Sequence, residues 1–123
     1  MGYDYRVPVH VWVAAALGSL GTLTSAIMDL RHVSSIDSVV FQLSVASGNP
    51  DIKIEWQQSE DGVTFDAVQT LIASTATTYA ASPSGLNFST INALLGRFIR
   101  FKLTDIATKA TTVTLDIQLR EHN

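Results

Sequence analysis

The sequence predicts an all-β domain that folds as an antiparallel β-sandwich of about seven or eight strands. Hydrophobic and polar residues alternate over several runs of about eight residues, which is the period of a strand with one buried face. Short clusters of Gly, Asn, Asp and Pro separate these runs, as is typical of turns. We expect residues 1–123 to form a single sandwich domain, because a chain of this length buries enough surface for one core.

Residues 7–13 are the first strand candidate, in which valines alternate with Pro8, His10 and Trp12. We expect residues 1–13 to be an N-terminal strand or arm that engages a neighbour, by pairing with the edge of an adjacent subunit's sheet. Weaker strand candidates follow at 22–30 and 66–73.

Four runs alternate clearly, at 38–46, 52–59, 97–104 and 111–120. Their alternation predicts one face in the core and one in water. The residues expected in the core are Val39, Phe41, Leu43, Val45, Ile52, Ile54, Trp56, Ile99, Phe101, Leu103, Val113, Leu115, Ile117 and Leu119. Segment 74–89 is expected to be a long loop or edge segment, and 90–95 a single helical turn that ends at Gly96.

The stretch EWQQSEDGVTFDAV at 55–68 gathers acids and amides, as a catalytic or calcium loop would. It lacks the ligand pattern of a calcium loop, and nothing selects a catalytic carboxylate pair. Asp61-Gly62 instead favours a tight hairpin turn, in which glycine supplies a positive φ. We therefore expect Glu55 and Gln57 to face water, and Val63 and Phe65 to begin the return strand.

Composition excludes several classes of protein. The chain has no cysteine, so it has neither a disulfide framework nor a thiolate metal site. Its net charge of −3 argues against nucleic acid as the main partner. The apolar run at 7–17 is shorter than the ~20 residues of a membrane span. Asp4 offsets Arg6, so this run also lacks the positive flank of a signal peptide and is expected to be retained.

No group of residues predicts catalysis or metal binding. The three histidines, His10, His32 and His122, have no metal-ligand spacing. Asp29, His32 and Asp37 are the nearest approach to an acid–base cluster, but their Ser-rich segment is typical of a turn. We expect no catalytic residue, no metal and no cofactor.

Several aromatic residues fall outside the expected core positions, namely Trp12, Tyr79, Phe88 and Phe98. They fit a partner interface, a sugar-stacking platform or ordinary core at the ends of the sheets.

Two segments together resemble a known family. Residues 52–68, IKIEWQQSEDGVTFDAV, and 96–104, GRFIRFKLT, combine a strand ending in Q-x-S, a D-G turn, an aromatic residue and a later G-R-aromatic-I-R-aromatic strand. This cadence resembles small, jelly-roll-like head decoration or cement proteins of tailed bacteriophages. It covers about half of the chain, and it also occurs in discoidin-like carbohydrate-binding sandwiches.

The resemblance implies a non-enzymatic virion protein, made in the host cytoplasm, that binds the major capsid protein on the capsid exterior. It implies symmetric copies or a homo-oligomer, with no direct contact to nucleic acid or membrane. The residues expected at the partner interface are His10, Trp12, Phe98, Arg100 and Arg120. Two alternatives stay open: another phage component, such as a tail, neck or fibre-attachment protein, and a carbohydrate-binding module that uses the loop around Asp61.

Overall fold

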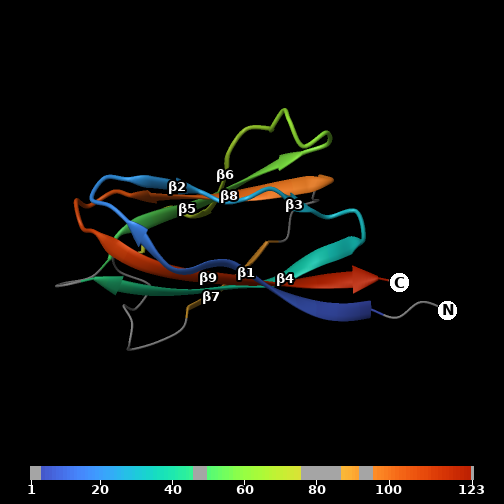
Figure 1. The fold of residues 1–123 in the computed structure, drawn as a ribbon, viewed down its shortest axis with the longest axis horizontal. Coiled ribbons are helices and arrows are strands. Elements are labelled where there is room, and N and C mark those ends of the chain that lie inside the picture. The colour runs from blue at the N-terminus through green and yellow to red at the C-terminus, as the bar shows by residue number, and fades with distance from the viewer. Residues whose placement is uncertain (1–3, 46–49, 76–86, 92–95, 123) are drawn as a thin grey trace.

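The computed structural model describes residues 4–45, 50–75, 87–91 and 96–122. Within these ranges the chain forms nine strand segments in two facing antiparallel sheets (Figure 1). The first sheet has the order β1 (Asp4–Leu17), β9 (Thr111–His122), β4 (Val33–Val45) and β7 (Asn87–Ile91). The second has the order β2 (Thr22–Thr24), β8 (Phe98–Asp105), β5 (Ile52–Ser59) and β6 (Gln69–Ile72), and β3 (Met28–Asp29) also pairs with β8. In the described ranges there is no helix long and apolar enough to cross a membrane.

The strand pairing is that of a jelly roll. β2 and β3 pair with the two ends of β8, so they act as one interrupted strand. Counted in this way, the first strand pairs with the last, the second with the last but one, and so on inward, as β1–β9, β2/β3–β8, β4–β7 and β5–β6. This nested order arises when a long antiparallel ribbon winds into two packed sheets. The predicted all-β sandwich is therefore confirmed.

The core lies between the sheets and consists of the residues that the alternation predicts. Of the predicted core residues, all except Val45 are buried, with exposures of 5% or less. They lie on β4, β5, β8 and β9, and each of these strands has a neighbouring strand on both sides in its sheet. Burial of one such aliphatic side chain stabilises a fold by about 1.5–3 kcal/mol, so this layer is the main source of stability.

Strand β1 departs from the predicted alternation at its centre. Its register against β9 shifts between His10 and Trp12 and again between Trp12 and Ala15. Because such bulges reverse the alternation, Trp12 packs against the core and Val13 is 69% exposed. The strict alternation of valines with Pro8, His10 and Trp12 therefore ends at Val11, and Trp12 packs against the core, one of the three roles left open for it.

The N-terminal strand belongs to the sandwich itself, since β1 pairs with β9 along most of its length. In the described part of the chain no strand pairs with the other edge of β1. Pro8 has no N–H, and the bulges bend the strand, so both features oppose continuous pairing along that edge.

The remaining segments were predicted less well. The weak candidates at 22–30 and 66–73 correspond to β2, β3 and β6. Thr90 and Ile91 belong to strand β7 rather than to a helical turn, because Ile91 pairs with Ile36 of β4. Residues 92–95, and most of 74–89 with Tyr79, lie outside the described residues.

Candidate interaction surface

The acidic loop at 60–68 is held by its own side chains. The Asp61 Oδ1 atom accepts hydrogen bonds from the N–H groups of Val63 and Thr64, both at 2.8 Å. The Ser59 hydroxyl accepts the N–H of Gly62 at 2.9 Å, and Gly62 has a φ of +76°, as the sequence predicts. The return strand β6 begins only at Gln69, so the prediction of a tight hairpin turn with Val63 and Phe65 in the return strand is wrong. Residues 60–68 therefore form a loop rather than a strand, and the Asp66 N–H ties its end to the Gln58 carbonyl of β5 at 2.9 Å.

We expect this loop to loosen in acid. The N–H groups of Thr64 and Val63 hold the pKa of Asp61 below its ordinary value of about 3.9. A depressed pKa means that the charged carboxylate stabilises the loop above about pH 4 and that this contribution is lost as the pH falls through the folded-state pKa. In an NMR titration the Val63 and Thr64 amide signals should shift with a midpoint below that of an exposed aspartate. Asp61→Asn should abolish the shift, and a midpoint at the ordinary value would contradict this assignment.

The loop covers part of the outer face of the second sheet. The guanidinium carbon of Arg100 lies 3.8 Å from the centre of the Phe65 ring, and Arg100 Nε donates to Gln57 Oε1 at 3.1 Å. The Phe98 ring lies beside the loop, since a Cβ atom on Gly62 would be 3.6 Å from it. Two predicted interface residues, Phe98 and Arg100, thus contact a loop of their own chain.

Glu55 is also buried on the outer face of this sheet. It is 9% exposed, faces Lys102 across the β5–β8 pair and lies 3.7 Å from Lys53 Nζ. The prediction that Glu55 faces water is therefore wrong. The alternation was predicted correctly, but the outer face of this sheet is only partly open.

Arg120 belongs to an ion-pair cluster on the outer face of the first sheet. Arg6 on β1 and Arg120 on β9 stand directly opposite each other. Both approach the same Asp37 oxygen, Oδ2, with Arg120 at 2.9 Å and Arg6 at 3.3 Å. Ser35 donates to the other oxygen at 2.8 Å, and the Arg120 hydrogen bond is the main cause of a lowered pKa for Asp37. The cluster thus carries two positive charges and one negative charge.

The candidate acid–base cluster of Asp29, His32 and Asp37 is not assembled. Asp29 accepts a hydrogen bond from Arg31 Nε at 2.6 Å, while Asp37 binds the arginines described above. His32 is exposed. In the described ranges no group of three or more His, Cys, Asp or Glu side chains is placed to hold a metal ion.

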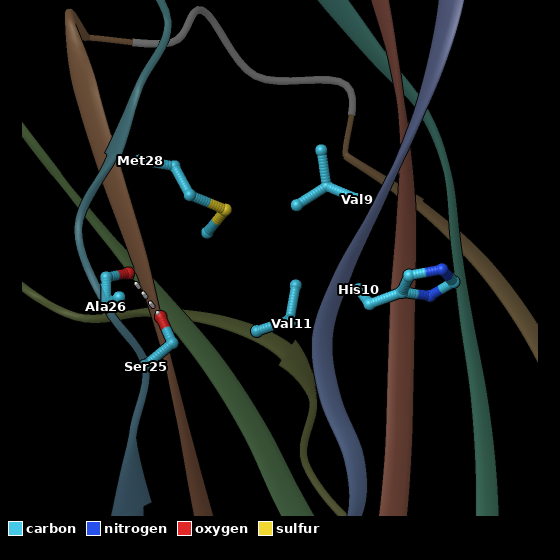
Figure 2. A pocket seen from close by; sticks show the side chains of 6 residues that line it. All are labelled: Val9, His10, Val11, Ser25, Ala26 and Met28. Carbon is cyan, nitrogen blue, oxygen red and sulfur yellow. Dashed lines mark hydrogen bonds between the residues drawn. The ribbon is translucent and has the colours of Figure 1, made fainter.

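A small hollow opens at the seam where the two sheets meet, between β1 and residues 25–28. Its volume is about 140 Å³, and Figure 2 shows the side chains of Val9, Val11 and Met28 pointing toward one another across it. His10 lies on the other side of β1, where its Nδ1 atom is 2.6 Å from Asp116 Oδ1. The lining residues are Val9, His10, Val11, Ser25, Ala26 and Met28.

Sequence reasoning did not find this hollow, because its two walls are far apart in the chain. The only local signal was the apolar Ile27-Met28 pair within the weak strand candidate at 22–30. Residues 25–27 interrupt the pairing with β8, although Ser25 still accepts the N–H of Phe101 at 2.8 Å.

No family model matches the sequence, and neither does any curated protein. Solved structures share the fold. A chain of the T13 particle of infectious bursal disease virus matches 97% of this chain and 31% of its own length, with a TM-score of 0.66 and 10% identity. A chain of the Gx strain of that virus matches 98% of this chain and 32% of its own, with a TM-score of 0.56 and 11% identity.

The protein thus spans about a third of the length of these viral-particle chains. At such low identity the likeness shows the fold alone: a jelly-roll sandwich that viral particles also contain. A chitosan-binding module from Paenibacillus sp. IK-5 matches 82% of this chain and 78% of its own at 17% identity. Its TM-score of 0.44 is too low to support an argument.

Proposed function

We propose that this protein is a virion structural protein that decorates a capsid, binding the major capsid protein on the outside of the shell. The observation that carries the proposal is the fold likeness to chains of viral particles over almost the whole chain, at a TM-score of 0.66. The resemblance of residues 52–68 and 96–104 to phage head decoration proteins supports the same role from the sequence.

Decoration stabilises a shell by burying surface between its subunits. A stable contact buries about 1,600 Å² in total, and repetition of a weaker contact over a symmetric shell adds avidity. Of the five proposed contact residues, His10 is the most open, with 69% of its side chain exposed. Arg120 is 39% exposed at the side chain and carries charge to the same face of the first sheet.

Reconstitution on particles tests the proposal. Viral heads would be purified from the virus whose genome encodes the chain and from a mutant that lacks this gene. Purified protein would then be added back to the heads of the mutant. We expect the protein to sediment with heads in near-stoichiometric amount relative to the major capsid protein, and to raise the temperature at which heads release DNA. Recovery only with tails would replace capsid decoration by another virion role. Absence from particles, together with binding on a glycan array, would favour a carbohydrate-binding module.

A further inference from the structure

The charged residues of the chain are confined to part of the sandwich. None of its 8 Lys and Arg or its 11 Asp and Glu residues lies in segments 7–28 or 67–96. The first segment contains most of β1, all of β2 and the start of β3, and the second contains β6 and β7. The strands that carry most of the charged residues, β4, β5, β8 and β9, have a neighbouring strand on both sides. Charge is therefore concentrated on the central strands of each sheet.

The two charge-free segments form opposite sides of the sandwich. β1 and β7 are the end strands of the first sheet, and β2/β3 and β6 are the end strands of the second. On the first side, β1 lies across the hollow from residues 25–28 (Figure 2), and on the second side β6 approaches β7. Among the described residues, each of these end strands pairs with one strand of its own sheet only. Both sides therefore have unpaired strand edges.

The two sides also present apolar side chains to solvent. Four of the six large apolar side chains that are exposed in the described residues belong to the charge-free segments. They are Val13 (69%), Leu20 (63%) and Ile27 (47%) on the first side, and Val68 (38%), directly before β6, on the second. Soluble proteins usually place charged residues on edge strands to discourage association, whereas the cores of interfaces are depleted in charge. The sides therefore have the composition of an interface.

Continuous backbone pairing is obstructed on the first side. Pro8 has no N–H, the register of β1 shifts twice, and residues 25–27 split the facing edge strand into β2 and β3. A neighbour on this side therefore packs through side chains and does not extend a sheet.

We propose that copies of this chain assemble side by side through their two charge-free sides. A single partner of another kind covers one side, whereas a contact that repeats between copies uses both, and it extends into a ring or a row. The chain has a net charge of −3, and contact at the charge-free sides keeps the like charges of neighbouring copies apart. The assembly needs no capsid, so its test is independent of the proposed function.

Sedimentation of the purified protein over a range of concentrations tests the assembly. We expect species larger than two copies as the concentration rises, and added salt should not dissociate them, because no ion pair holds the contact. Val13→Asp places a carboxylate on the first side and Val68→Asp places one on the second, where burial of an unpaired charge is costly. Each of these variants should therefore form nothing larger than a dimer, and the double variant should be a monomer.

The matched control is Val63→Asp, the same substitution at a valine that is 83% exposed in the acidic loop, outside both charge-free segments. It should assemble like the unmodified protein, and circular dichroism checks that every variant is folded. Three outcomes would overturn the proposal: a monomer at all concentrations for the unmodified protein, equal effects of Val13→Asp and Val63→Asp, or assemblies that dissociate when salt is added.

Discussion

Replacing Phe101 by alanine is expected to lower the free energy of unfolding by about 3–5 kcal/mol, the usual cost of removing a large aromatic ring from a core. Phe101 lies on the inner face of β8, opposite Trp56 of β5, and is 0% exposed. The loss combines the transfer free energy of the ring with the cavity that it leaves. Since domains are stable by only about 5–15 kcal/mol, the variant should be close to unfolding at ordinary temperatures.

Denaturant unfolding with a fluorescence or circular dichroism readout measures this effect. Phe101→Leu keeps most of the side-chain volume and should cost much less. Phe98→Ala, on the outer face of the same strand, is the matched control for loss of an aromatic ring, because Phe98 is only half-buried. The slope of the unfolding free energy against denaturant concentration should be unchanged, so the loss of stability appears as a lower midpoint concentration of denaturant. Equal losses of stability for Phe98→Ala and Phe101→Ala would contradict the assignment of Phe101 to the buried face of β8 and of Phe98 to its outer face.

The strands that the sequence predicted well share one property: each has one face in the core and a regular register over most of its length. In β5, β8 and β9 a period of two therefore identified Ile54, Phe101 and Ile117 as core residues. In β1 the same rule failed at Trp12 and Val13, because the register shifts depend on how β1 meets β9.

The sequence also did not predict that the outer face of the second sheet is partly covered. Glu55 and Gln57 alternate as outward residues should, and the sequence gives no sign that Phe65 will fold back onto Arg100. The candidate site depends on the same kind of contact. The hollow joins β1 to residues 25–28, and the ion-pair cluster joins β1, β4 and β9. Such surfaces arise from the nested strand pairing, which local patterns do not encode.

The buried carboxylate of Asp105 was also missed, and its removal should be nearly as damaging as loss of Phe101. Asp105 ends β8 and is 1% exposed. Its Oδ2 atom accepts the N–H groups of Leu20 at 2.8 Å and Lys109 at 2.9 Å, and Oδ1 accepts that of Ala107 at 3.3 Å. Leu20 and Thr108 have positive φ values of 55° and 56°, which are strained for these residue types. One carboxylate therefore holds two strained loops together at this end of the sandwich.

Asp105→Ala leaves these part-buried N–H groups without their acceptor, and an unsatisfied group costs about 1–3 kcal/mol when it is fully buried and less where water reaches it. We expect a total loss of about 3–4 kcal/mol in the free energy of unfolding, since water will reach part of the opened site. Asp105→Asn keeps one acceptor oxygen and should lose about half as much. The matched control is Asp66→Ala, an exposed acid whose removal should change stability by less than about 0.5 kcal/mol. Hydrogen exchange should show faster exchange at Leu20 and Lys109 in Asp105→Ala, with the core of β9 still protected. Equal stability of Asp105→Ala and Asp66→Ala would mean that this carboxylate does not hold the two loops.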